Sequence, residues 1–344
     1  MRRAAIITLV ALAVAAPAQA AGGLEEVKVL TLSWVGDMAF DTGRGLPAGG
    51  VGGAIGPLKK ALDADVVTGN LEGTLATSGA SKCGGSGGGD CFSFRAPPSY
   101  AGGLRRVGFD VLNMANNHAH DYGDIGLAQT RAAVRGAGMV AAGLNGEIST
   151  LRVNGVKLAF VGFSPYTWSW LLNDLVTAQS VVRSAAARAD LVVVFFHGGA
   201  EGADKTHVPF GAEGAFGENR GDLRAFSHAV IDAGAGIVLG SGPHVIRGIE
   251  RYRDRMIAYS LGNFAGPNTL STGGTTALSG ILRVTLTDDG DVLRGRWVPV
   301  RLQSPGVPRF DPSHASTALV RSLSASDFGR RFPIFSTGRI EGAP

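Results

Sequence analysis

The chain has 344 residues, of which 32 are basic and 28 acidic, and its net charge is +4. A charge so close to balance does not favour a nucleic-acid partner, because such proteins carry strongly basic surfaces. The length is enough for one large domain or two small ones.

The first 20 residues have the pattern of a signal peptide. Arg2 and Arg3 precede an apolar run that ends near Pro17 and is too short to span a bilayer. Ala18-Gln19-Ala20 then has the small-x-small form of a cleavage site. We therefore expect a signal peptide over residues 1–20 and a periplasmic or secreted mature protein without a transmembrane span. An uncleaved membrane anchor is the alternative.

Apolar periodicity and turn residues predict alternating strands and helices, with antiparallel hairpins in the middle and at the end. In chain order they are strand 27–35, helix 55–62, strand 65–68, helix 97–107, strand 109–114, helix 124–135, hairpin 151–160, helix 173–189, strand 191–196, loop 198–221, helix 222–233, strands 236–239 and 256–260, and hairpin 281–302. The pattern indicates an α/β sandwich with mixed sheets. The residues from 304 onward show no motif.

The two cysteines, Cys83 and Cys91, bracket a glycine-rich stretch. In an exported chain this arrangement favours a disulfide between them. A soft metal site is the alternative, but no histidine lies near the two thiols in the sequence.

Six short polar clusters each follow an apolar, strand-like run. They are Gly36-Asp37, Asn70-Leu71-Glu72, Asn116-Asn117-His118, His197-Gly198-Gly199, Pro243-His244 and Leu261-Gly262-Asn263-Phe264. Ligands of open α/β sheets bind outside the carboxyl ends of the strands. Acids, amides and imidazoles that converge there suit a divalent metal better than an organic cofactor. Each cluster alone has a structural explanation, but six in sequence predict a metal site.

The densest cluster runs from Asn116 to Gly123 and holds two amides, two imidazoles and an acid. We favour His118 over His120 as the functional imidazole, since histidine serves as a general acid or base near neutral pH. Glu201 can reach the same site from the loop after His197. Glu250 and Asn263 are expected to orient ligating side chains.

The order of these clusters resembles the CapA family of capsule and poly-γ-glutamate biosynthesis proteins, which have a calcineurin-like metallophosphatase fold. The matching stretches run from Gly36 to Phe264 and include Asn70-Leu71-Glu72-Gly73, Asp121-Tyr122-Gly123 and Gly242-Pro243-His244-Val245. The resemblance implies a metallophosphoesterase-like, four-layer α/β/β/α sandwich over residues 21–303, with 304–344 as a C-terminal extension.

When the family's functional positions are transferred to this sequence, the resemblance implies a site that holds one or two divalent ions of Mn, Zn or Fe. It also implies that His118 is the catalytic imidazole. The implied metal ligands are Asp37, Glu72, Asn117, His197 and His244, and the implied supporting residues are Asn70, Asp121, Glu201, Glu250 and Asn263. The chain departs from the calcineurin-like pattern at two positions. Ala39 and Ser241 stand where such proteins often carry histidine.

The resemblance implies an exported metal-dependent hydrolase, a phosphoesterase, linked to capsule or poly-γ-glutamate biosynthesis. Its substrate would be phosphorylated or polyanionic, and membrane proteins of capsule synthesis would be its partners. One alternative is a non-catalytic factor for polyanion assembly or export. Five arginines near the site in sequence would suit it: Arg220, Arg224, Arg247, Arg251 and Arg253. A metal-dependent hydrolase of γ-glutamyl amide bonds is the other alternative.

Overall fold

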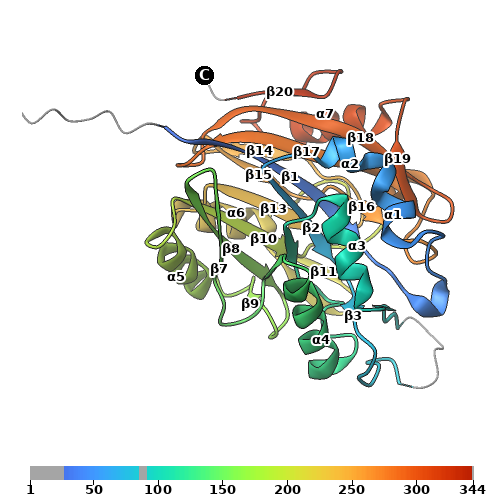
Figure 1. Ribbon diagram of the computed structural model, residues 1–344. Coiled ribbons are helices and arrows are strands. Elements are labelled where there is room, and N and C mark those ends of the chain that lie inside the picture. The colour runs from blue at the N-terminus through green and yellow to red at the C-terminus, as the bar shows by residue number, and fades with distance from the viewer. Residues whose placement is uncertain (1–26, 85–90, 343–344) are drawn as a thin grey trace, which may run out of the picture.

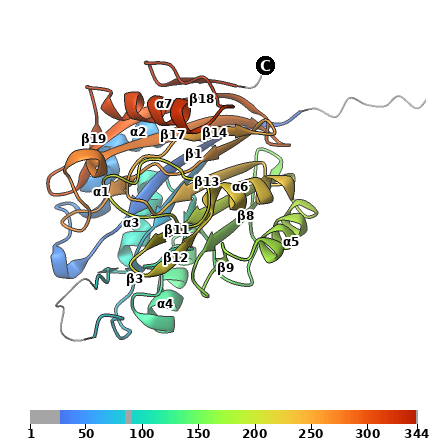
Figure 2. The same ribbon diagram turned by 180° about the vertical axis from the view of Figure 1, so that it is seen from behind.

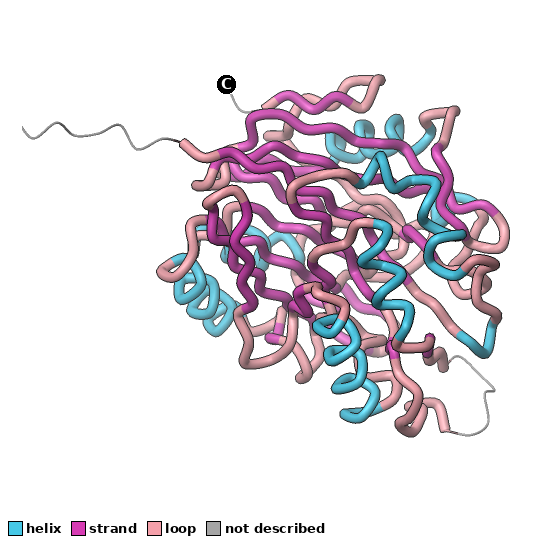
Figure 3. The backbone as a smooth tube through the Cα atoms, in the orientation of Figure 1, coloured by secondary structure: helices cyan, strands magenta, loops and turns pink. Residues whose placement is uncertain are grey.

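The computed structural model describes residues 27–84 and 91–342. The predicted signal peptide, residues 1–20, lies outside these residues. Two large mixed sheets form the centre of the molecule, and helices lie on the periphery (Figure 3). Within the described ranges, no helix is long and apolar enough to cross a bilayer.

The first sheet has the strand order β19-β18-β17-β1-β2-β5-β6, with β16 beside β1 and β20 beside β18. Its strands are β1 (Val29–Met38), β2 (Val66–Leu71), β5 (Val111–Asn113), β6 (Val140–Ala142), β16 (Asn263–Ala265), β17 (Leu278–Thr287), β18 (Val292–Gln303), β19 (Val307–Phe310) and β20 (Arg339–Glu341). β1, β2, β5 and β6 are parallel, whereas β17 runs antiparallel to β1.

The second sheet has the order β14-β15-β13-β10-β8-β7, with β9 beside β8. Its strands are β7 (Ser149–Val153), β8 (Val156–Ser164), β9 (Trp170–Leu171), β10 (Leu191–His197), β13 (Ile237–Ser241), β14 (Ile249–Tyr252) and β15 (Arg255–Ala258). The parallel strands β8, β10, β13 and β15 form its centre. β10 is buried along its whole length, as its unbroken apolar run predicts.

Helices cover the outer face of each sheet, so the fold has four layers. Helices α1 (Gly50–Ile55), α3 (Ser99–Val107) and α4 (Gly123–Gly136) pack on the first sheet, and α5 (Leu175–Ala186) and α6 (Leu223–Asp232) pack on the second. Figures 1 and 2 show the two groups of helices on opposite sides of the molecule. The predicted α/β/β/α sandwich with mixed sheets is confirmed.

Apolar side chains fill the space between the two sheets. Trp34 of β1 stacks on Phe195 of β10, with ring centroids 5.0 Å apart, and both side chains are fully buried. Phe160 of β8 packs beside Phe195 at 6.0 Å. This contact sets the spacing of β1 and β10 a few residues before both strands end.

Two segments for which the sequence predicts no helix or strand, residues 198–221 and those after 304, contain both helix and strand or a hairpin. The loop over 198–221 contains a short hairpin, β11 (Glu213–Ala215) and β12 (Glu218–Gly221). The residues after 304 contribute β19, helix α7 (Ala315–Asp327) and β20. β19 and β20 pair with β18, and α7 contacts β14, β17 and β18. Short elements complete the chain: α2 (Lys59–Leu62), β3 (Thr74–Leu75), β4 (Arg95–Ala96), η1 (Thr42–Arg44), η2 (Gly56–Leu58) and η3 (Gly274–Ala277).

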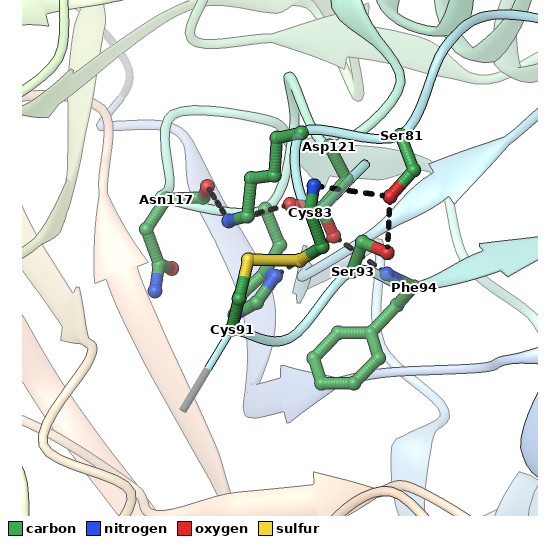
Figure 4. The surroundings of a disulfide bond; sticks show 9 residues. Ser81, Cys83, Cys91, Ser93, Phe94, Asn117 and Asp121 are labelled. Carbon is green, nitrogen blue, oxygen red and sulfur yellow. Dashed lines mark hydrogen bonds and ion pairs between the residues drawn. A yellow bond between two sulfur atoms is a disulfide. The ribbon is translucent and has the colours of Figure 1, made fainter. Parts of the chain in front are cut away.

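Cys83 and Cys91 form a disulfide, which confirms the predicted pairing (Figure 4). The bridge joins residues eight positions apart, so it restricts the unfolded chain only modestly.

We expect a double variant, Cys83→Ser with Cys91→Ser, to lose about 2–3 kcal/mol of unfolding free energy because the unfolded chain regains loop entropy. Urea unfolding of the two proteins measures the difference. Non-reducing mass spectrometry of the purified protein provides the control for the starting state. Two free thiols in that material would contradict the pairing.

Candidate metal centre

Strand ends from both sheets meet at one buried place. Asp37 lies one residue before the end of β1, where it pairs with Asn70 of β2 on one side and Asn263 of β16 on the other. In the second sheet, His197 of β10 pairs with Ser241 of β13. The side chains of Asp37, Asn70 and His197 are fully buried. The sequence clusters therefore converge where parallel strands of both sheets finish.

A bulge at Gly36 aims Asp37 at this place. Val35 pairs with Gly69 and Asp37 with Asn70, so Gly36 is an extra residue in β1. One extra residue reverses the alternation of side chains, and Asp37 turns toward the second sheet. A Cβ at position 36 would lie 1.9 Å from the carbonyl oxygen of Gly262, so only glycine fits there. The amide of Asp37 donates to that same carbonyl at 3.1 Å.

Asn70 connects the strand ends. Its Nδ2 donates to Asp37 Oδ1 at 2.8 Å and lies 3.3 Å from His197 Nδ1. Its Oδ1 accepts from Asn113 Nδ2 at 3.0 Å and from Asn116 Nδ2 at 3.2 Å. Because both ends of the amide are engaged, Asn70 holds the carboxylate of Asp37 in one orientation.

Glu72 lies between two imidazoles. Its Oε1 is 3.6 Å from His197 Nε2 and 3.5 Å from His244 Nε2. The other ring nitrogen of His244, Nδ1, is 3.2 Å from Asp37 Oδ2 and 2.8 Å from Asn263 Oδ1. Asp37, Glu72 and His244 each offer one atom, and these atoms lie within 4.8 Å of one another. Such a cluster has the size of a metal site.

Several buried atoms here have no hydrogen-bond partner among residues 27–84 and 91–342. They are Asp37 Oδ2, both carboxylate oxygens of Glu72, Asn117 Oδ1 and His197 Nε2. Buried polar atoms without partners cost free energy, and buried charges cost more. Carboxylate and amide oxygens together with imidazole nitrogens are donors for a borderline divalent cation. The residues present therefore fit a metal ion.

Ser241 of β13 lies beside the His197 ring. Its Oγ donates to the Phe196 carbonyl at 3.1 Å and lies 3.2 Å from His197 Nδ1. Nδ1 of His197 thus has polar neighbours in Ser241 and Asn70, whereas Nε2 has no hydrogen-bond partner among the described residues and is the ring atom open to a cation. The unpartnered Nε2 is the one that faces Glu72.

Without a cation, burial disfavours the charged forms of the central side chains, although their neighbours favour charge on one of them. Burial raises the pKa of Glu72 well above its usual range and lowers the pKa of His197 well below it. Burial also opposes the charge on His244, but the Glu72, Asp37 and Glu201 carboxylates raise its pKa well above normal. A divalent cation removes the conflict, because it favours ionised carboxylates and neutral imidazoles.

His118 lies beside this centre and is held by Asp121. Its Nδ1 is 2.8 Å from Asp121 Oδ2, and that oxygen also accepts from the backbone amide of Phe94 at 2.6 Å. The Phe94 ring packs 4.4 Å from the imidazole. Burial lowers the pKa of His118, against the opposing charge of Asp121. With Nδ1 engaged, Nε2 is the ring atom available to a bound molecule.

His120 points elsewhere. Its ring stacks on Trp168 at 4.8 Å, and its Nε2 is 2.9 Å from the exposed carboxylate of Asp124. These contacts give His120 a structural role beside the site.

Among the predicted supporting residues, Glu201 and Asn263 contact the centre and Glu250 does not. Glu201 Oε2 is 3.7 Å from His244 Nε2, and its Oε1 is 2.9 Å from Arg220. Glu250 instead binds His228 at 3.0 Å and the Tyr259 hydroxyl at 2.7 Å, on the outer side of the second sheet. Its place on β14 directs the carboxylate away from the strand ends.

The five arginines named above do not form a basic patch. Arg247 is buried and binds Glu213 through both terminal nitrogens, and Arg220 is buried against Glu201. Arg224 donates to the carbonyls of Val208 and Asp327. Arg251 pairs with Asp254, and Arg253 pairs with Asp232. These arginines are engaged in ion pairs and hydrogen bonds that join loops and strands of the fold.

A cavity of about 720 Å³ opens over the centre. Its lining includes Asn117, His118 and His244 from the centre and Lys82, Tyr166 and Trp168 from segments that carry no motif. Trp168 Nε1 donates to the Asn116 carbonyl at 2.8 Å, and the Tyr166 ring stacks on Trp168 at 4.9 Å. Sequence reasoning missed these three residues because no recognisable spacing links them to the polar clusters.

The chain folds as a four-layer α/β/β/α sandwich with carboxylates, amides and imidazoles gathered at its strand ends. The family described as "Bacterial capsule synthesis protein PGA_cap" matches residues 31–268, and the chain belongs to this family.

Curated relatives carry related names. The "PGA biosynthesis protein CapA" of Bacillus subtilis is 34% identical over 179 residues, which cover 47% of this chain and 43% of the relative. The "Capsule biosynthesis protein CapA" of Bacillus anthracis is 32% identical over 227 residues, 60% of this chain and 51% of the relative. A "Probable polyglutamine synthesis accessory protein" of Mycobacterium tuberculosis is 27% identical over 274 residues, 70% of this chain and 67% of that protein. The chain thus spans about half the length of the two Bacillus relatives.

Two solved structures are similar at 13% identity. The 5'-nucleotidase precursor of Thermus thermophilus has a TM-score of 0.45, and the match covers 87% of this chain and 59% of that one. The NAD nucleotidase of Haemophilus influenzae has a TM-score of 0.41, with 89% and 65% covered.

Proposed function

We propose that this protein is an exported, metal-dependent phosphoesterase that acts in capsule or poly-γ-glutamate biosynthesis. The observation that carries the proposal is the set of buried, unpartnered acceptor atoms on Asp37, Glu72, Asn117 and His197, counted over the described residues. Together with His244, these four residues would hold one or two divalent ions at the strand ends of the two sheets. Mn, Zn and Fe suit this mixture of oxygen and nitrogen donors.

The protein's own residues would bind and orient the ester. Hydrolysis breaks the P–O bond to the leaving group, joins a water oxygen to phosphorus and delivers a proton to the leaving oxygen. When bound, a divalent ion offsets the charge of the phosphoryl oxygens and lowers the pKa of water. His118 Nε2 would approach the phosphoryl group or supply the proton, because Asp121 engages Nδ1 and fixes the ring.

The state of the arginines argues against a purely polyanion-holding role. A site that holds a long acidic chain needs cations that are free to contact it, whereas Arg220 and Arg247 are buried in ion pairs with glutamates. The cavity beside His118 suits an active site better. The names of the Bacillus relatives support the setting in capsule or poly-γ-glutamate biosynthesis, and membrane proteins of that process would be its partners.

Metal analysis of the purified mature protein, joined to a substrate screen, tests the proposal. We expect bound divalent metal and turnover of phosphoesters that Mn²⁺, Zn²⁺ or Mg²⁺ stimulates and a chelator abolishes. The same panel contains γ-glutamyl amides, and turnover of these alone would replace the phosphoesterase proposal with an amidase. Metal uptake without turnover of any substrate would favour a binding or assembly role.

A further inference from the structure

Lys82 presents a positive charge to the cavity beside His118. Its ammonium is 2.7 Å from Asp121 Oδ1 and donates to the Asn117 carbonyl at 3.2 Å. The Lys82 side chain is 37% exposed, whereas the carboxylate of Asp121 behind it is fully buried. The positive end of this ion pair therefore faces the cavity that Lys82, Asn117 and His118 line together.

The ammonium has capacity for a further partner. A lysine has three N–H donors, and Lys82 gives one of them to the Asn117 carbonyl, while its contact with Asp121 Oδ1 is an ion pair. Asp121 divides its charge among Lys82, the His118 ring and the Phe94 amide, so it does not cancel the lysine alone. In contrast to Lys82, Arg220 in the same cavity is 1% exposed and tied to Glu201.

The disulfide holds Lys82 in this place. Lys82 immediately precedes Cys83, and its own amide donates to the Asp121 carbonyl at 2.8 Å. Ser81 Oγ accepts from the Cys83 amide at 3.2 Å and bonds to Ser93 Oγ at 2.9 Å, so both sides of the bridge are pinned (Figure 4). A flexible lysine would otherwise lose much side-chain entropy on ordering. The disulfide therefore fixes the backbone next to Lys82 and limits the positions that its ammonium can take.

We propose that Lys82 is a specificity-determining residue that contacts a terminal phosphoryl group, and that the substrate is accordingly a phosphomonoester. This inference rests on the proposed function. A monoester phosphoryl group carries up to two negative charges and three terminal oxygens, whereas a diester carries one charge and two such oxygens. A fixed ammonium beside the metal centre therefore favours the monoester, through a charge-assisted hydrogen bond that the diester does not satisfy equally.

The test uses the full mature chain loaded with Mn²⁺ and compares Lys82→Met with wild type. On p-nitrophenyl phosphate, we expect Lys82→Met to lose about tenfold or more in kcat/KM, chiefly through KM, as for a lost hydrogen bond to a charged group. On bis(p-nitrophenyl) phosphate the loss is expected to be several-fold smaller. Lys82→Arg should restore most of the preference for the monoester. Lys60→Met, which removes an exposed lysine of α2, is the matched control for net charge and should change neither substrate.

A second readout does not need turnover. Calorimetric titration of the Mn²⁺-loaded protein with inorganic phosphate should give about tenfold weaker binding for Lys82→Met, with equal metal content in both proteins. The double cysteine-to-serine variant should show a smaller loss of phosphate affinity, because Lys82 remains but the disulfide that holds its backbone is gone.

The possible results separate the two proposals. Equal losses on both esters would mean that Lys82 acts only by supporting Asp121 and would overturn the inference alone. Unchanged phosphate affinity in Lys82→Met would do the same. A metal-loaded wild type that neither binds phosphate nor cleaves either ester would overturn the proposed function itself, and the inference with it.

Discussion

Replacing His118 with alanine is expected to lower kcat/KM on an activated aryl phosphate by about 10²- to 10⁴-fold, the usual cost of removing a positioned acid or base. The reason is geometric, since Asp121 holds Nδ1 and leaves Nε2 toward the cavity. Metal content should change little, because Asn117 and the strand-end residues stay in place. Steady-state kinetics with metal occupancy measured alongside provides the comparison.

His120→Ala is the matched control, two residues along the same segment. Its ring stacks on Trp168 and pairs with Asp124, so its removal should cost far less than a hundredfold in rate. Similar losses in the two variants would show that the segment acts as a structural unit and that His118 has no separate chemical role.

Glu72→Gln is expected to have opposite effects on the stability of the metal-free and the metal-loaded protein. Without metal, the variant should be at least as stable as wild type, because it removes a buried carboxyl group whose two oxygens have no hydrogen-bond partner among the described residues. With metal at about 100 times its dissociation constant, wild type should gain about 2.7 kcal/mol and the variant should gain almost nothing. Thermal unfolding with and without Mn²⁺ or Zn²⁺, after treatment with a chelator, measures both effects.

Glu250→Gln is the control for this experiment. Glu250 is a buried glutamate too, but it binds His228 and Tyr259 away from the strand ends. It should therefore lower stability by a similar amount with and without metal and leave metal uptake unchanged. A metal-dependent gain that persists in Glu72→Gln would remove Glu72 from the set of ligands.

Much of the architecture follows from local sequence pattern. The apolar run before His197 predicts a strand buried on both faces, and the structure has one at β10. The polar clusters at strand ends predict a convergence that the pairing of Asp37 with Asn70, and of His197 with Ser241, provides. Such inferences succeed because the alternation of side chains along a strand, and the polar residues that follow its end, can be recognised in the sequence.

Other features depend on contacts between distant segments. Simple alternation along β1 would turn Asp37 toward the helices, and only the bulge at Gly36 reverses it. Glu250 follows His244 closely in sequence, yet its strand carries it to the outer face of the sheet. Lys82 is adjacent to a cysteine in a stretch without motifs, and its role beside Asp121 appears only once the chain is folded. None of these can be read from composition or spacing.

The stack of Trp34 on Phe195 carries a consequence for how this centre can change over time. Trp34 precedes Asp37 by three residues and Phe195 precedes His197 by two, and the two rings hold β1 and β10 at a fixed separation. In the proposed metal centre, the two sheets would supply opposite sides of one coordination sphere, and the distance between those sides would depend on apolar side chains that do not contact the ion. A smaller residue at either position that still permits folding would alter affinity for the ion from a distance. Selection for the proposed activity would therefore act on buried residues between the sheets, where its effect would resemble selection for stability.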